Sequence, residues 1–218
     1  RNLNYKTSIN NFLCQRTEEV KKIIELRIPN RIGHIWNERL KYSWLFDIPC
    51  PTNEFKHEML SNLSLWNAES SDFILELPPI SNIMPEYDIL FQVHSFNEPG
   101  KDYPYYAEVI KLLDKKYSIA FVGSKEEFSE ADKIAAGHSH SNYCGKLTFL
   151  ETLHLIKNSR LIVGNDGGLL KCANMMAASA IQIFRAASSV IERCKILRGT
   201  NLIEPSGMDV INSINEIL

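Results

Sequence analysis

From about residue 85 onwards, short apolar runs alternate with longer segments in which apolar positions recur every three or four residues. Such runs are typical of strands buried on both faces, and the longer segments are typical of amphipathic helices. The expected strands are 88–94, 118–122, 142–144, 160–164 and 180–184, and the expected helices are 105–116, 125–136, 148–157, 166–178 and 208–218. Thr148 and Glu151 form a capping box at the start of the third helix. This alternation predicts a doubly wound, parallel α/β sheet.

Residues 1–80 follow a different pattern. We expect strands at 7–13 and 31–35 and helices at 16–26 and 54–66. Pro78, Pro79 and Pro85 then mark a linker. Two strands and two helices are too few to close a sheet, so this segment is expected to belong to a larger domain. We therefore predict a partial N-terminal α/β domain over 1–80 and a second domain over 81–218.

Composition and charge exclude several classes of protein. Of the 218 residues, 44% are hydrophobic and 23% are charged, which excludes a disordered chain. The formal net charge of −2 gives no general attraction to nucleic acid, so no nucleic-acid partner is expected. The longest apolar run, 172–184, is shorter than the roughly 20 residues of a membrane span. With no visible signal peptide and five scattered cysteines, a cytoplasmic protein with reduced thiols is expected.

Two candidate sites follow expected strands, and ligands of open parallel sheets lie beyond the carboxyl ends of the strands. Lys101 lies in the loop after 88–94. A cation beside helix N–H groups suits a diphosphate, although a solvated loop lysine is the simpler alternative. Asp166, Gly167 and Gly168 directly follow another strand. Their backbone could approach a phosphate or ribose, or Asp166 could simply cap the next helix.

Other candidates carry less information. Glu127 follows the strand 118–122, where a carboxylate could accept hydrogen bonds from a ribose or merely complement a helix dipole. His138 and His140 could bind a metal, but the sequence offers no third ligand at a suitable spacing, so a solvated loop is expected. The chain has no G-x-G-x-x-G or P-loop motif, so neither dinucleotide nor P-loop nucleotide binding is predicted.

Taken together, these segments resemble glycosyltransferase family 9, the bacterial lipopolysaccharide heptosyltransferases. The resemblance spans nearly the whole chain and rests on the order and spacing of several motifs. The most specific ones are a lysine-containing loop with the helix that follows, a strand that ends in an Asp-x-Gly turn, and an alanine-rich helix. The matching segments are 146–156, 161–168, 173–184, 101–104, 28–33 and 56–58.

The resemblance implies the GT-B architecture, in which two Rossmann-like domains face each other and the C-terminal one holds the sugar nucleotide, usually ADP-heptose. We expect one complete C-terminal Rossmann-like domain and the remnant of an N-terminal one. The implied donor-site residues are Lys101, Phe96 and Asn97 for phosphate, Glu127 for ribose, Leu147 near the base, and Asp166, Gly167 and Gly168 for the diphosphate and sugar. The family is metal-independent, so no cofactor is expected. The implied acceptor is a lipopolysaccharide core or related glycan, reached by peripheral contact with the inner membrane.

The chain also departs from the family. Gly167 replaces a residue with a hydroxyl group, and Lys171 replaces a histidine, although a lysine can still meet phosphate. The segment with the family's general-base aspartate has no counterpart here, so the first part of the N-terminal domain is expected to be absent and the catalytic residues are unassigned. Two hypotheses follow: a glycosyltransferase, or an inactive nucleotide- or glycan-binding relative. An epimerase is disfavoured, because neither Tyr103 nor Tyr143 begins a Tyr-x-x-x-Lys pair.

Overall fold

The structure is a computed structural model that describes residues 7–10, 30–36, 48–52, 74–94, 99–136, 138, 140–185 and 191–218. The chain divides into two compact units, residues 1–73 with 192–194 and residues 74–191 with 195–218. Among the described residues, the first unit contains a three-stranded sheet and the second a six-stranded sheet.

The sheet of the first unit is parallel, with the strand order β1-β2-β3. Its strands are β1 (Thr7–Asn10), β2 (Asn30–Trp36) and β3 (Ile48–Thr52). The first two confirm the strands expected from the sequence, whereas the two helices expected in this unit lie outside the described residues. The sequence does not predict β3, because Pro49 and Pro51 lack backbone donors. Strands at a sheet edge tolerate proline, and β3 lies at an edge of the described sheet.

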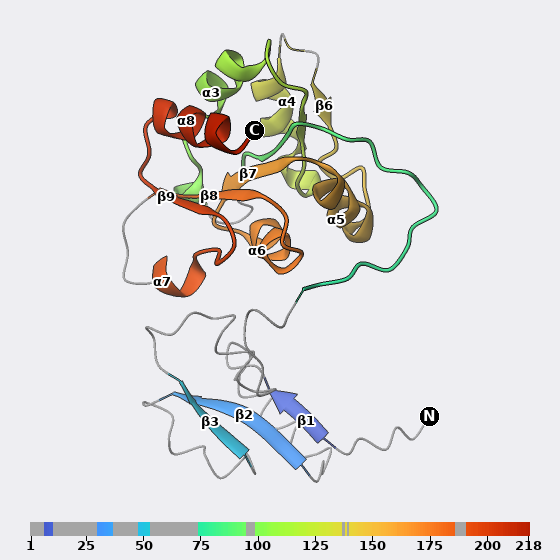
Figure 1. Ribbon diagram of the computed structural model, residues 1–218, viewed down its shortest axis with the longest axis vertical. Coiled ribbons are helices and arrows are strands. Elements are labelled where there is room, and N and C mark those ends of the chain that lie inside the picture. The colour runs from blue at the N-terminus through green and yellow to red at the C-terminus, as the bar shows by residue number, and fades with distance from the viewer. Residues whose placement is uncertain are drawn as a thin grey trace. The chain divides into compact units, whose positions relative to one another are not determined.

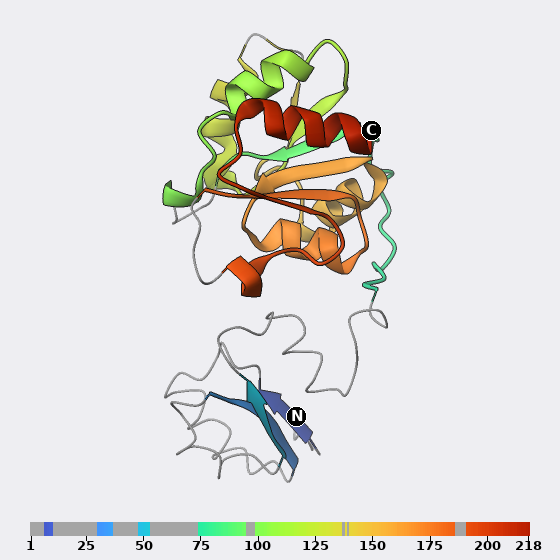
Figure 2. The same ribbon diagram turned by 60° about the vertical axis from the view of Figure 1, so that its left-hand side comes forward.

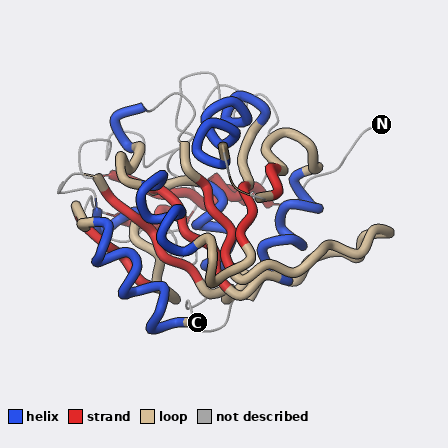
Figure 3. Tube along the Cα trace, turned by 90° about the horizontal axis from the view of Figure 1, so that it is seen from above, coloured by secondary structure: helices blue, strands red, loops and turns tan. Residues whose placement is uncertain are grey.

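The second unit is built on a parallel sheet with the order β6-β5-β4-β7-β8-β9. Its strands are β4 (Ile89–Gln92), β5 (Ile119–Phe121), β6 (Ser141–Asn142), β7 (Leu161–Asn165), β8 (Ala180–Phe184) and β9 (Thr200–Ile203). The first five overlap the predicted strands and confirm the parallel α/β sheet. From the central pair β4 and β7, the chain runs outwards in both directions, and Figure 3 shows strands flanked by helices.

Helices cover both faces of this sheet, as a doubly wound fold requires. The α-helices are α3 (Tyr106–Leu113), α4 (Phe128–Ala135), α5 (Phe149–Asn158), α6 (Gly168–Met175), α7 (Ile191–Cys194) and α8 (Gly207–Ile217). Residues of α3, α4 and α8 pack on one face, and residues of α5 and α6 pack on the other. Figures 1 and 2 show α8 and α6 on opposite sides of the sheet. The capping box of Thr148 and Glu151 is confirmed at the start of α5.

Alternate residues of the strands pack into two apolar clusters, one on each face of the sheet. In β4, Ile89 and Phe91 enter the cluster under α3 and α8, whereas Leu90 enters the cluster under α5 and α6. All three are completely buried. The alternation ends at the carboxyl edge of the sheet, where β4 and β7 finish in the buried polar residues Gln92 and Asn165.

Two further elements are not predicted by the sequence. The short helix α7 is one, and three of its four residues, 192–194, belong to the first unit. The edge strand β9 of the second unit is the other. β9 begins with the polar residues Thr200 and Asn201, and the Asn201 side chain bonds the backbone N–H and C=O of Ile196. Asn201 therefore holds the segment before β9 in place. The polar residues at the start of β9 interrupt the apolar run by which a buried strand is predicted. Among the described residues, none of the helices has the length and apolar character needed to cross a membrane.

Candidate functional site

The strands β4 and β7 are neighbours, and the chain leaves them towards opposite edges of the sheet. At such a switch point the loops that follow the two strands separate, and a ligand can lie beyond their carboxyl ends. The loop after β4 carries Lys101, and the loop after β7 carries Asp166. The structure thus brings two of the predicted site residues to this point.

Lys101 and Asp166 form an ion pair, with 3.2 Å between Nζ and Oδ2. The other carboxylate oxygen, Oδ1, accepts a hydrogen bond of 3.1 Å from Nε2 of Gln182 in β8. The Lys101 side chain is 43% exposed, whereas that of Asp166 is only 12% exposed. The carboxylate is therefore held in place, while the ammonium group remains accessible to an incoming anion.

Gly167 and Gly168 open helix α6. Gly167 is the N-cap residue, and its backbone is extended, with φ −163°. Because glycine has no side chain, it makes no side-chain capping hydrogen bond. A β-carbon at Gly168 would meet no atom of the described structure within 4 Å. The alternative in which Asp166 caps this helix is wrong, because its carboxylate binds Lys101 and Gln182 instead. The first N–H groups of α6, which carry partial positive charge, therefore lie beside an open glycine surface.

A row of residues across three strands supports this turn. Gln92, Gly164 and Gln182 are Cα partners across β4, β7 and β8. A β-carbon at Gly164 would lie 2.6 Å from Leu170 Cδ2 and 3.0 Å from Gln92 Cβ, so glycine leaves room for the buried Leu170 side chain of α6. The Gln92 amide lies 3.5 Å from the position of a β-carbon at Gly167, and its Oε1 makes no hydrogen bond within the described structure. The sequence interpretation missed both glutamines, although a polar residue inside an apolar strand signals them.

Asn165 fixes the loop that carries Lys101. It is completely buried, and its Oδ1 accepts hydrogen bonds from the backbone N–H of Tyr103 and the hydroxyl of Tyr106, both at 3.1 Å. Since Tyr103 is two residues beyond Lys101, these bonds tie the loop after β4 to the end of β7. This positioning role is not predicted by the sequence.

Glu127 lies beyond the carboxyl end of β5, in the 3-10 helix η5 (Lys125–Glu127) that leads into α4. Glu127 is 4% exposed, and its Oε2 makes no hydrogen bond with any described residue. Burial raises the pKa of Glu127, and the backbone N–H of Ser124 and the charge of His94 oppose this shift. A buried acceptor that lacks a donor is costly in the free chain, so the carboxyl group suits a ligand hydroxyl.

Phe96 and Asn97 lie outside the described residues. On either side of them, His94 and Asp102 join the two ends of the loop, with 2.5 Å between Nδ1 and Oδ2. A second 3-10 helix, η4 (Pro99–Lys101), runs up to Lys101.

Leu147 and Lys171 are the last two of the predicted site residues. Leu147 is half-buried against the apolar cluster of α5 and α6, one residue before the N-cap of α5. Lys171 lies in the first turn of α6, where its backbone N–H donates to the carbonyl of Gly167 at 3.3 Å. Their roles toward a nucleotide stay predictions.

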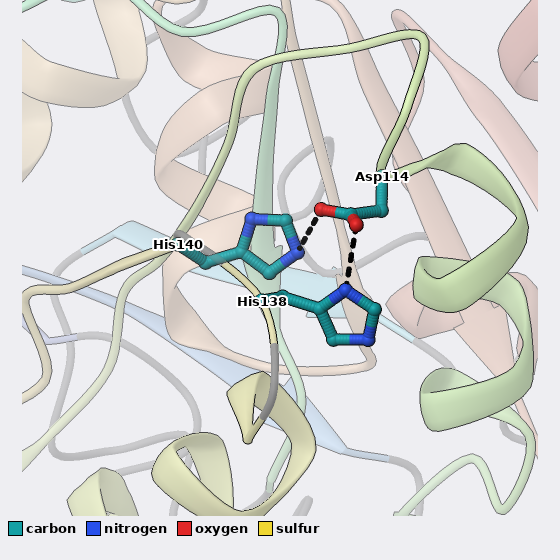
Figure 4. A group of neighbouring side chains, drawn as sticks. All are labelled: Asp114, His138 and His140. Atoms are coloured by element: carbon teal, nitrogen blue, oxygen red, sulfur yellow. Dashed lines mark hydrogen bonds and ion pairs between the residues drawn. The ribbon is translucent and has the colours of Figure 1, made fainter.

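His138 and His140 do not form the expected solvated loop. The side chain of His140 is only 4% exposed and that of His138 is 20% exposed. Both imidazoles face Asp114, which follows helix α3 (Figure 4). Burial lowers the pKa of His140, while Asp114 acts in the opposite direction. The sequence interpretation failed because the third group comes from another helix.

Comparison with known proteins gives one family and several similar folds. The family model described as glycosyltransferase family 9 (heptosyltransferase) matches residues 23–194. The E. coli ADP-heptose lipopolysaccharide heptosyltransferase II is 16% identical, with a TM-score of 0.73 over 98% of this chain and 76% of that chain. The E. coli heptosyltransferase WaaC with ADP is 14% identical, with a TM-score of 0.73 over 99% and 74% of the two chains.

The same E. coli enzyme has also been solved with ADP-2-deoxy-2-fluoro heptose. That structure is 15% identical, with a TM-score of 0.73 over 98% of this chain and 73% of that chain. No curated protein sequence gave a match. At these identities the solved structures establish the fold, and they confirm the expected GT-B architecture.

Proposed function

This chain belongs to glycosyltransferase family 9, the heptosyltransferases, and from that membership we propose that it transfers a sugar from a nucleotide diphosphate sugar to a glycan. The proposed donor is ADP-heptose, and the proposed acceptor is a lipopolysaccharide core or a related glycan. One heptosyltransferase of the same fold has been solved both with ADP and with a fluorinated ADP-heptose, which supports an adenine nucleotide as the donor. We place the reaction in the cytoplasm, with peripheral contact at the inner membrane face.

The observation that carries this proposal is the ion pair of Lys101 and Asp166 beside the start of α6. A diphosphate at this point would accept hydrogen bonds from Lys101 Nζ and from the free N–H groups after Gly167. Asp166, held by Gln182, would accept hydrogen bonds from sugar hydroxyls. Phosphate and sugar would thus meet donors and an acceptor of the right kind.

The remaining residues would bind the nucleoside. The buried carboxyl group of Glu127 would accept hydrogen bonds from the ribose, and the backbone at Leu147 would lie near the base. Phe96 and Asn97 would add contacts to phosphate from the loop that carries Lys101. Lys171, in the first turn of α6, would supply a second cation for the diphosphate.

Transfer breaks the bond between the sugar carbon and the diphosphate oxygen and forms a bond from that carbon to an acceptor hydroxyl oxygen. Negative charge develops on the departing diphosphate. Lys101 and the N–H groups of α6 would stabilise that charge from fixed positions, which is the general role of electrostatic preorganisation. We propose that no metal ion takes part in this step.

A titration of thermal stability with ADP tests the proposal, with UDP and GDP for comparison. A ligand at 100 times its dissociation constant adds about 2.7 kcal/mol to the free energy of unfolding. We expect ADP to stabilise the wild-type chain and Asp166→Ala to lose most of that effect. Asp132→Ala is the matched control, because Asp132 is exposed on α4, away from the site. Equal stabilisation of all three proteins, or none, would contradict the proposal.

A second candidate function is nucleotide or glycan binding without transfer. It is favoured by Gly167, which has no side-chain hydroxyl, and by Lys171, which stands in place of the usual histidine. Selective ADP binding without sugar transfer from ADP-heptose to a lipopolysaccharide core acceptor would support this candidate. Transfer that Asp166→Ala abolishes would support the enzyme.

A further inference from the structure

Three potential metal ligands converge at the edge of the large sheet opposite the nucleotide site. Asp114 is the C-cap residue of α3, and His138 and His140 lie in the connection from α4 to β6. In a parallel sheet these connections lie at the amino ends of the strands, whereas Lys101 and Asp166 follow carboxyl ends. Figure 4 shows both imidazoles turned towards the carboxylate.

The ligand atoms already lie close together. His138 Nδ1 is 2.6 Å from Asp114 Oδ2, and His140 Nε2 is 3.0 Å from Asp114 Oδ1. All three ligand atoms lie within 4.8 Å of one another. Ligand atoms bound at about 2.0–2.1 Å to a tetrahedral zinc ion are about 3.3 Å apart, so small side-chain rotations suffice to form such a site.

The surroundings favour a bound ion over a simple hydrogen-bonded group. The two imidazole rings stack with centroids 5.2 Å apart and planes at 12°, which aligns their nitrogens on the same carboxylate. His140 also packs edge-on against Phe121 of β5 and is nearly inaccessible. Its buried Nε2 lies 3.0 Å from Asp114 Oδ1 but is not oriented for a hydrogen bond to that oxygen. A metal ion bound by both atoms would satisfy them together.

We propose that Asp114, His138 and His140 bind a Zn²⁺ ion that fastens the end of α3 to the segment entering β6. Two imidazoles and one carboxylate are ligands that zinc prefers, with the fourth position left to water. The site has a mechanical reason, because β6 contains only Ser141 and Asn142 and lies at the edge of the described sheet. An ion held by its neighbouring loop stabilises this short strand.

Metal titration of the full chain tests this proposal. After treatment with EDTA and dialysis, we expect one equivalent of Zn²⁺ to raise the melting temperature by several degrees, and one equivalent of Co²⁺ to give the visible absorption of four-coordinate cobalt. Asp114→Asn and His140→Gln, which nearly preserve side-chain volume, should each weaken Zn²⁺ affinity at least tenfold. His154→Gln is the matched control, because the His154 imidazole is outside the cluster and hydrogen-bonds the carbonyl of Pro78 instead.

Circular dichroism of each variant without metal establishes that it is folded. Equal Zn²⁺ affinity in wild type, Asp114→Asn and His140→Gln would overturn the proposal, as would the absence of any metal-dependent change in the wild type. Affinity for ADP gives an independent readout, because the two sites lie at opposite edges of the sheet. Zn²⁺ should change ADP affinity by no more than about twofold. A requirement for Zn²⁺ in ADP binding would refute the proposal that the ion acts only on the connection between α3 and β6.

Discussion

The carboxyl group of Glu127 occupies the space that a side chain at Gly123 would need. A β-carbon at Gly123 would collide with Glu127 Oε2 and lie 2.9 Å from its Cδ. Cys144 Sγ closes the same space at 3.3 Å, and burial raises the pKa of this thiol to about 12, so that it stays neutral. Glycine at position 123 is therefore what allows a buried carboxyl group at the end of β5.

We expect Gly123→Ala to weaken ADP binding at least tenfold, because the new methyl group displaces the proposed ribose acceptor without removing it. Isothermal titration calorimetry with ADP measures the change. Gly207→Ala serves as the control. Gly207 is the first residue of α8, and a β-carbon there would meet Val109 at an ordinary van der Waals distance of 3.6 Å. If Gly123→Ala binds ADP as tightly as the control, Glu127 does not contact the nucleotide.

Glu127→Gln should stabilise the free chain and weaken ADP binding. The pKa of Glu127 is raised above its ordinary value of 4.5, chiefly by burial. Between that value and the raised one, the folded chain keeps a proton that the unfolded chain has lost, so the free energy of unfolding falls as pH rises. Glutamine cannot ionise, so the variant lacks this fall.

Urea unfolding of both proteins at several pH values above 4.5 measures this difference. The stability advantage of Glu127→Gln should grow with pH, by no more than about 1.4 kcal/mol per pH unit, and then level off. Glu130→Gln is a matched control on the exposed surface of α4. A stability difference that does not change with pH would mean that Glu127 is as well solvated in the folded chain as in the unfolded one.

Much of the second unit follows from the sequence for a simple reason. Strands such as β7 and β8 are buried on both faces, and their apolar runs leave few alternatives. The capping box of Thr148 and Glu151 is equally local, and the structure reproduces it. Interactions inside one segment are therefore predictable from that segment.

The site is less predictable, because its members meet only through the topology. Lys101 and Asp166 could each be proposed alone, but their ion pair depends on the adjacency of β4 and β7. Gln182 was missed because its partner, Asp166, lies 16 residues earlier, after the neighbouring strand. Asp114 was missed because it lies 24 residues before His138. Polar residues at strand ends and helix ends are where long-range pairing decides the outcome.

Lys101→Met should affect ADP binding more than folding. The Lys101 side chain is 43% exposed, but its partner Asp166 is only 12% exposed and keeps Gln182 as a hydrogen-bond donor. We therefore expect the free energy of unfolding to fall by about 1 to 3 kcal/mol, with ADP affinity reduced at least tenfold under conditions where the variant is fully folded. Lys133→Met is the control for loss of a lysine ion pair, since Lys133 pairs with Glu130 on the exposed surface of α4. Equal ADP affinity in the two variants would exclude Lys101 from the phosphate site.

Gly167→Ser tests the difference between this chain and its family. The backbone at Gly167 is extended, and a β-carbon would meet the Gln92 amide at 3.5 Å and the Asn165 carbonyl oxygen at 3.6 Å, both ordinary contacts, so serine fits. Serine and glycine differ as N-cap residues by only a few tenths of a kcal/mol, so stability should barely change. The added hydroxyl should tighten ADP binding by a few-fold in calorimetry. Weaker binding would show that the turn requires glycine for close approach of the ligand.

Asn165→Ala should destabilise the chain and misplace the loop after β4. The substitution leaves the Tyr103 N–H and the Tyr106 hydroxyl without their buried acceptor, at a cost of about 2 to 4 kcal/mol. Tyr106→Phe removes one of these donors together with its need for a partner, and should cost only about 1 kcal/mol. Urea unfolding measures both effects.

The two variants should also differ in ADP affinity, because only Asn165→Ala frees the backbone two residues beyond Lys101. We expect that variant to bind ADP at least fivefold more weakly under conditions where it is fully folded, while Tyr106→Phe stays within about twofold of wild type. Equal affinities would mean that the loop holds Lys101 in place without Asn165. In that case the loss of Asn165, the last residue of β7, would act on folding alone.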